Sequence, residues 1–386
     1  MLSPLYLSSE LPQRMTSLMS EIENEMLARV AYYVRQYGRV TGTAEFLALK
    51  QTQYGLLHRD LLKIVAKYSG LTEAEVAAAF TQSAANSLAY DNRILKNYEA
   101  AGLFTPLHPI GATLGATLGA TASAAAMQRT LTAAINRALD IQNLTNTSCV
   151  QSALEAFTRA TDKAYLSIVS GAQSFDAATR QAVDEIAQMG LSVVEYDRSG
   201  REIHYSVEAA TRRTLITSVS QVCGQIQEMN LLALGCSLVQ TTSHAGARPS
   251  HAEWQGGKYW LGKRVSGFGS LVDDCGYGSV DGIKGINCYH DFFPTTPDAP
   301  SAFDRDPAKN QLGIDNDELY ELRQKQRYHE RQIRAAKKQQ GVYEAAGMTK
   351  EAKASGALVR QRQAEIRDFL KENPILQRDY TRERVA

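Results

Sequence analysis

Residues 236–256 read C-S-L-V-Q-T-T-S-H-A-G-A-R-P-S-H-A-E-W-Q-G, a short β-rich run followed by a polar loop. Its first seven residues are rich in β-branched side chains and predict a strand. The next fourteen hold two histidines, an arginine, a glutamate and a tryptophan, with glycine and proline bending the chain between them. Such a density of polar groups is typical of a catalytic loop, a metal site or a rigid structural loop.

The residues around this stretch predict an α+β domain. Residues 191–207 contain two β-rich runs around an Asp-Arg-Ser-Gly turn and predict a hairpin. Residues 207–233 predict a long helix that ends at Gly235, a residue suited to a C-cap. From residue 243 to 300 the chain is rich in glycine, aromatic residues and turns. We therefore expect a compact α+β domain at residues 125–300, with short strands and long glycine-rich loops.

The residues before this domain predict a mostly helical region. Apolar spacing indicates helices at 14–36 and 43–69, and Thr72-x-x-Glu75 predicts a capping box that opens another helix ending near residue 95. Residues 1–105 are thus expected to form a helical hairpin or bundle. Further helices are expected at 122–142, 148–170 and 176–189.

A glycine, alanine and threonine-rich connector is expected at residues 106–124. Pro106 and Pro109 stop any helix there, and G-A-T-L-G-A-T-L-G-A-T follows. Its glycines recur every four residues, as in the small-residue ridges of membrane helix pairs. The run is short and rich in threonine, so we interpret it as a flexible or closely packed connector instead.

A basic helical tail is expected at residues 301–386. Residues 318–340 and 350–372 predict helices, with a break around residues 341–347. Residues 318–386 carry 16 Lys and Arg against 10 Asp and Glu, and their apolar positions are sparse. We therefore expect the tail to lie on the surface, loosely attached.

One stripe of the tail is a candidate contact for DNA phosphates or for an acidic partner. Spacings of three and four residues place its members on neighbouring turns of one helix. A solvated helix face without a partner is the alternative. The stripe consists of Arg323, Arg327, Arg331, Arg334 and Lys338.

Composition narrows the class of protein. The 386 residues carry a net charge of +1, so the chain as a whole gives no reason to expect a nucleic-acid or membrane partner. We expect no signal peptide, because the N-terminal residues lack a basic and an apolar region, and no membrane span. Five cysteines, an odd number, favour reduced thiols over a disulfide framework.

The sequence contains no clear pattern of catalytic residues. Ser243 beside His244 and Ser250 beside His251 cannot face each other as nucleophile and base normally must, and no G-x-S-x-G pattern occurs. No phosphate-binding loop or dinucleotide fingerprint occurs either, so no nucleotide cofactor is expected. We expect a protein that is not an enzyme.

Zinc is the one cofactor for which donors are present. Zinc binds cysteine and histidine, usually four ligands, and the spacing here matches no familiar finger. We favour the other interpretation, a set of buried thiols and hydrogen-bonded imidazoles, and therefore expect no cofactor. His244 lies among the possible donors, and if zinc is bound the candidate ligands are Cys275, Cys288, His290 and His251.

The loop also has the composition of a rigid platform. Arg248 precedes Pro249 and can donate to a carboxylate or to carbonyl oxygens. Trp254 and Trp260 are the two tryptophans, and each can anchor the loop by burying its ring. A structural motif is therefore predicted from His244, Arg248, His251, Trp254, Gln255 and Gly256.

Four blocks carry a resemblance to a known family. They are V-E-A-A-T-R-R-T at 207–214, S-H-A-G-A-R-P-S-H-A-E-W-Q-G-G-K-Y-W at 243–260, C-G-Y-G at 275–278 and G-I-N-C-Y-H-D-F-F-P at 285–294. In this order they resemble the phage minor capsid protein type 2 family, and the basic tail at 320–337 resembles its C-terminal region. Tyr289 departs from the pattern, which often has arginine there.

The resemblance implies a structural protein of the virion, present in few copies and acting with the portal protein in head assembly. It also implies a distant relation to Mu-type head-morphogenesis proteins. The implied partners are the portal, the major capsid or scaffolding protein and non-specific DNA, with assembly in the host cytoplasm. A virion-associated enzyme or toxin-like domain that uses the His/Cys cluster is the alternative, and a plain nucleic-acid-binding protein is a third hypothesis.

Overall fold

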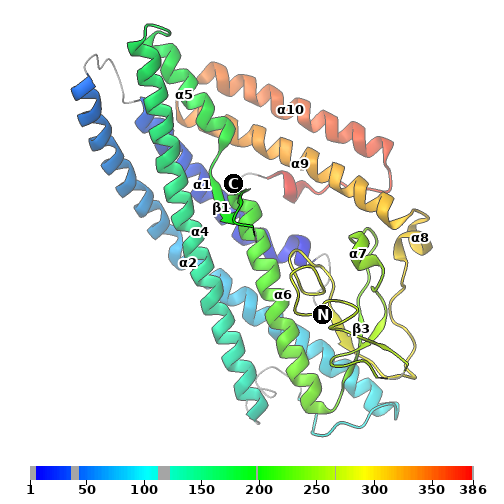
Figure 1. Ribbon diagram of the computed structural model, residues 1–386. Helices are drawn as coiled ribbons and strands as arrows, with labels where there is room; N and C mark the ends of the chain where they lie inside the picture. Colours follow the sequence, from blue (N-terminus) through cyan, green and yellow to red (C-terminus); the bar gives the residue numbers. More distant parts are fainter. Residues whose placement is uncertain (1–5, 36–42, 112–121, 197–198, 266, 385–386) are drawn as a thin grey trace. The chain divides into compact units, whose positions relative to one another are not determined.

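The computed structural model describes residues 6–35, 43–111, 122–196, 199–265 and 267–384 (Figure 1). Helices dominate: α1 Leu11–Arg35, α2 Thr43–Ala100, α4 Ala122–Val169, α5 Phe175–Met189, α6 Val207–Leu234, α7 Pro249–Ala252, α8 Pro307–Leu312, α9 Asn316–Ala345 and α10 Thr349–Glu372. Short strands lie between them: β1 Ser192–Tyr196, β2 Glu202–Ser206, β3 Leu238–Thr241, β4 Lys258–Trp260, β5 Gly269–Ser270 and β6 Phe292–Pro294. The α+β fold class with a mostly helical chain is thereby confirmed.

The chain forms two compact units, each assembled from three segments. Unit 1 consists of residues 1–13, 74–140 and 212–324, and unit 2 of residues 14–73, 141–211 and 325–386. The boundary falls within α1, α2, α4, α6 and α9. The sequence predicts four consecutive domains, each expected to fold independently. The division into two compact units does not test independent folding, so the four domains stay a prediction.

Unit 1 holds the strands around the opening stretch. Its sheet has the order β5-β4-β3-β6, and β3 is antiparallel to both of its neighbours, with Val239 opposite Tyr259 and Pro294. Apolar side chains from this sheet, its loops and helices α2 and α6 form the core. Members of that core include Leu95, Leu231, Val239, Trp254, Tyr259, Cys275, Cys288 and Phe292.

Unit 2 is built from helices and the hairpin. Strands β1 and β2 pair antiparallel, with Val194 opposite His204, as the sequence predicts. One apolar core joins α1, α2, α4, α5, α9 and α10, and it includes Met26, Leu61, Phe157, Ile186, Val342 and Ala352. In the C-terminal part, α9 and α10 lie side by side (Figure 1), and the rings of His329 and Phe369 are 5.2 Å apart.

Two predicted helix breaks are absent from the described chain. Instead of capping a new helix, Thr72 Oγ1 donates to Tyr68 O at 2.9 Å, and α2 continues past it. Likewise Thr145 and Thr147 donate to carbonyl oxygens four residues earlier, within the uninterrupted α4. A threonine hydroxyl can donate to a carbonyl oxygen within a helix as well as cap the start of one. The local pattern alone therefore predicted breaks where the helices continue.

The tail is packed more firmly than its composition suggests. Helix α9 runs through Gly341, and the break comes only at Gly347, whose φ is +65°. Val342, Tyr343 and Ala352 are buried in the core of unit 2. The expectation of a loosely attached surface tail is therefore wrong, because a few apolar residues on one face suffice to place helices in a core.

The connector expected at residues 106–124 is described only in part, because residues 112–121, which hold most of the glycine repeat, lie outside the described residues. Within the described ranges, no helix combines the length and apolar character that crossing a bilayer requires.

Candidate functional site

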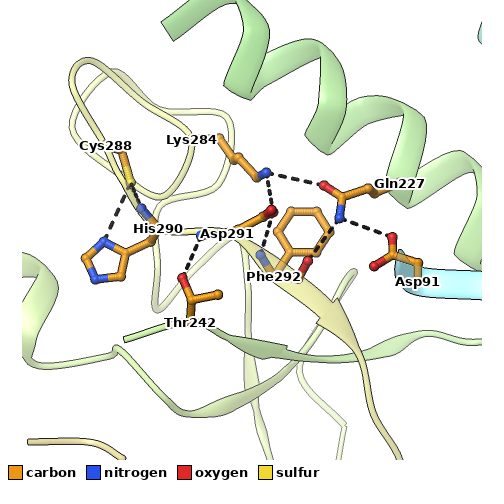
Figure 2. A network of polar contacts seen from close by, with 8 residues as sticks. All are labelled: Asp91, Gln227, Thr242, Lys284, Cys288, His290, Asp291 and Phe292. Atoms are coloured by element: carbon orange, nitrogen blue, oxygen red, sulfur yellow. Dashed lines mark hydrogen bonds and ion pairs between the residues drawn. The ribbon is translucent and has the colours of Figure 1, made fainter. Parts of the chain in front are cut away.

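Hydrogen bonds between Thr242 and Asp291, just beyond the ends of strands β3 and β6, position the candidate site in unit 1. After β3, Thr242 N donates to Asp291 O and Thr242 Oγ1 accepts from Asp291 N, both at 2.8 Å. This pairing places the residues just before β6 beside the start of the polar loop (Figure 2). Pro249 then begins the short helix α7, which carries His251 back toward the same point.

His251, Cys288 and His290 form a buried cluster of three donor atoms. His251 Nδ1 lies 3.4 Å from His290 Nδ1, and Cys288 Sγ lies 3.7 and 3.8 Å from these two nitrogens. All three residues are buried. The structure thus brings together three of the four predicted zinc ligands.

Cys275 is not a member of this cluster. It is buried in the apolar core of unit 1, and burial raises the pKa of its thiol to about 12. His244 also stays outside the donor cluster, since its Nδ1 faces Ala245 O at 3.3 Å while its ring stacks on His290 with centroids 4.4 Å apart. Sequence spacing alone could not separate these two residues from the true cluster.

The outer ring nitrogens of both clustered histidines face oxygen atoms. His251 Nε2 lies 2.7 Å from Asp281 O, a backbone carbonyl that can only accept. His290 Nε2 lies 3.1 Å from Gln255 Oε1. The same Oε1 accepts from the backbone N–H of His244 at 3.1 Å, which fixes the orientation of the amide. Both Nε2 atoms therefore carry hydrogen, and both Nδ1 atoms present lone pairs to each other.

Burial keeps this cluster uncharged in the absence of a metal. It lowers the pKa of His251 to about 4, with Arg248 adding to the effect. The pKa of His290 is held well below its usual range by burial and by the neighbouring histidines. Burial also raises the pKa of the Cys288 thiol. A thiol protonated in this way is a poor nucleophile, which argues against cysteine catalysis.

The remaining residues of the predicted structural motif hold the loop around the cluster. The Trp254 ring lies 4.7 Å from His251 and 4.8 Å from His290, centroid to centroid, and is buried. Arg248 Nη2 donates to Ile286 O at 2.7 Å, so the arginine binds a carbonyl oxygen. Gly256 has φ +69°, and a Cβ there would lie 2.8 Å from Asp304 O, so glycine is required.

A buried polar network adjoins the cluster, and no pattern in the sequence predicts it. Lys284 Nζ forms an ion pair with Asp291 Oδ1 and donates to Gln227 Oε1 at 3.3 Å (Figure 2). Gln227 Nε2 in turn donates to Asp91 Oδ2 and to Phe292 O, both at 3.1 Å. Lysine in a glycine-rich loop is normally exposed, so no local signal could have identified this network.

The basic stripe of the tail does not form one free face. Arg323 donates to Ala245 O within unit 1. In unit 2, Arg334 pairs with Glu208 at 3.0 Å and Lys338 with Glu23 at 2.6 Å. Arg331 is exposed and Arg327 is half-buried. Three of the five predicted phosphate contacts thus have partners inside their own unit.

Comparisons with known proteins place the chain among phage proteins. The family model described as phage minor capsid protein 2 matches residues 2–371. A "structural protein" of Lactococcus phage LL-H is 28% identical over 239 residues, which is 60% of this chain and 62% of that protein. The chain thus matches less than two thirds of that relative's length.

A second "structural protein", from Lactococcus phage mv4, is 39% identical over 120 residues, or 30% of this chain and 90% of that protein. No solved structure matches the chain significantly.

Proposed function

The chain belongs to the phage minor capsid protein 2 family, and from this premise we propose that it is a structural component of a tailed-phage head that acts with the portal protein during assembly. The match at residues 2–371 carries the proposal, because it takes in nearly all of both units. On this proposal the protein is assembled in the host cytoplasm and resides in the virion, in few copies.

The geometry of the His/Cys cluster supports a structural role over a catalytic one. His251, Cys288 and His290 are buried, and their donor atoms face one another. A substrate has to reach a nucleophile or a general base within hydrogen-bond distance. The alternative of a virion-associated enzyme or toxin-like domain that uses this cluster is therefore less well supported.

Two pairs of exposed apolar side chains on α4 support a protein partner. Ile141, Leu144, Leu166 and Val169 belong to unit 2 and are 40%, 66%, 66% and 57% exposed. Ile141 with Leu144 and Leu166 with Val169 form two pairs, about 33 Å apart along the helix at about 1.5 Å per residue. The exposed charged residues Glu155 and Arg159 lie between the pairs on the same side of the helix. A protein partner would remove this apolar surface from water, whereas DNA phosphate would not. The portal is the partner we propose for it, with major capsid or scaffolding protein as the other candidates.

DNA is the weaker candidate for a partner. Binding to phosphates needs several free Lys and Arg side chains. Of the predicted stripe, Arg323, Arg334 and Lys338 are already bound to groups within their own units. The exposed Arg331 remains as a possible phosphate contact.

Particles of the phage that encodes the chain provide the test. Quantitative mass spectrometry of purified heads should detect this protein in a low ratio to the major capsid protein, and mild disruption should release it together with the portal. Leu144→Ser combined with Leu166→Ser should reduce that co-release. Leu232→Ser, which alters a leucine 51% exposed on α6, is the matched control. Absence of the protein from particles that contain the portal would contradict the proposal.

A further inference from the structure

The triangle of donor atoms in unit 1 has the dimensions of a metal site. Its edges are 3.4 Å between the Nδ1 atoms of His251 and His290, and 3.7 and 3.8 Å from these atoms to Cys288 Sγ. A tetrahedral zinc ion with Zn–N of about 2.0–2.1 Å and Zn–S of about 2.3 Å holds such donors about 3.3–3.6 Å apart. We propose that His251, Cys288 and His290 bind a zinc ion through these three atoms.

The hydrogen atoms available to the cluster do not satisfy it. Both Nε2 atoms must donate, His251 to Asp281 O and His290 to Gln255 Oε1, so both Nδ1 atoms are acceptors. The thiol of Cys288 has one hydrogen and can serve only one of them. Two lone pairs then face each other at 3.4 Å in a buried site, which is unfavourable without a cation.

A zinc ion resolves this arrangement. It accepts both nitrogen lone pairs and binds the sulfur as thiolate, and the thiol proton leaves to solvent. The carbonyl of Asp281 and the amide of Gln255 are then the outer partners that ligand histidines usually have, since they fix the tautomer and the orientation of each ring.

The donor set selects the metal. Two imidazoles and a thiolate suit zinc, whereas magnesium and calcium require oxygen ligands. Three protein ligands leave the fourth tetrahedral position to a water molecule, so the site lacks the four protein ligands of a closed structural zinc site. His251 lies in α7 and the other two ligands lie just before β6, so the ion would close the glycine-rich residues between them into a loop. In this stretch β4 and β5 have only three and two residues, and a metal would supply order that regular structure does not.

Elemental analysis of the full chain tests the proposal directly. The untagged protein, produced in zinc-supplemented medium and purified without chelator, should contain about one zinc ion per chain. Cys288→Ser and His290→Ala should lose it. Cys275→Ser should keep it, because this thiol is buried in the same core but lies outside the donor cluster.

Two measurements on the wild-type chain cover the case in which the ligand variants do not fold. Chelator treatment should lower the melting temperature, and zinc, but not magnesium, should restore it. Cobalt(II) bound in place of zinc should give the strong thiolate-to-metal absorption and the intense visible bands of a tetrahedral site. Wild-type protein that is folded and free of zinc, with a melting temperature that zinc does not change, would overturn the proposal. So would stoichiometric copper, or zinc that is lost with Cys275→Ser but retained in Cys288→Ser.

Discussion

Lys284 and Asp291 form an ion pair inside unit 1, with side chains 2% and 0% exposed. Both lie in the segment that leads into β6, and Lys284 occupies the left-handed region with φ +62°. The pair links this loop to α6 through Gln227 and, beyond it, to Asp91 of α2. A charge pair at this depth is stable only while both partners remain.

Removal of the lysine charge should therefore cost more than removal of the pair. Lys284→Met leaves the Asp291 carboxylate buried and unpaired, and we expect a loss of about 3–5 kcal/mol in the free energy of unfolding. The double variant Lys284→Met with Asp291→Asn should recover part of that loss. Chemical denaturation of both variants measures the coupling. Equal stabilities of the single variant and the wild type would show that the pair is not buried in solution.

The carboxyl group of Asp91 gives a pH-dependent prediction. Burial and the nearby Asp291 raise the pKa of Asp91 well above its usual value. The folded protein then holds this proton more tightly than the unfolded chain does. The contribution of Asp91 to the free energy of unfolding is fully present below the usual aspartate pKa, about 3.9. It is lost as the pH rises through the raised pKa.

Asp91→Asn should remove that dependence. The asparagine side chain is neutral at every pH. The unfolding free energy of the variant should therefore decline less than that of the wild type as the pH rises through this window. Denaturant titrations at several pH values give the difference, and Asp273→Asn, at an exposed aspartate, is the control. Parallel pH profiles for Asp91→Asn and the wild type would contradict the assignment.

Trp254 should be a main support of the histidine cluster. It is 7% exposed and contacts the rings of His251 and His290. Trp254→Ala should lower the unfolding free energy by about 3–5 kcal/mol. Trp254→Phe keeps an aromatic ring and should cost clearly less. Thermal unfolding distinguishes the two, and an unchanged melting temperature in Trp254→Ala would mean that the indole does not anchor the loop.

Lys338 should stabilise unit 2 and not act as a surface cation. Its ammonium group pairs with Glu23, whose side chain is 1% exposed and also accepts from Leu191 N at 3.1 Å. Lys338→Met leaves that carboxylate without its charge partner, and we expect a loss of about 3–5 kcal/mol.

The exposed Lys325 on the same helix is the matched control, and Lys325→Met should change stability by less than about 0.5 kcal/mol. Chemical denaturation measures both variants. Similar small effects for the two lysines would restore the picture of a tail that contributes little to the core.

Local pattern was sufficient for much of the secondary structure. The periodicity of apolar residues predicts α1 and α5, the β-rich runs predict β1 and β2, and Gly235 marks the end of α6. These features depend on neighbours within a few residues, which the sequence shows directly. The same holds for the blocks at 207–214 and 243–260, whose resemblance to a phage minor capsid family the family match confirms.

The sequence alone predicts the α+β class, the longer helices, strands β1, β2 and β3, the family and a set of candidate metal ligands. Which of these ligands meet depends on the tertiary fold: His251, Cys288 and His290 cluster, while Cys275 lies apart. The fold also pairs Lys284 with Asp291 and places part of α9 in the core of unit 2. The contacts of His251 and of α9 join residues that are distant in sequence. The Lys284–Asp291 pair spans only seven residues, and it depends on the conformation of the loop between them. Such contacts depend on strand register, on helix continuity and on the hydrogen-bond partners of buried polar groups. A local sequence pattern contains none of this information.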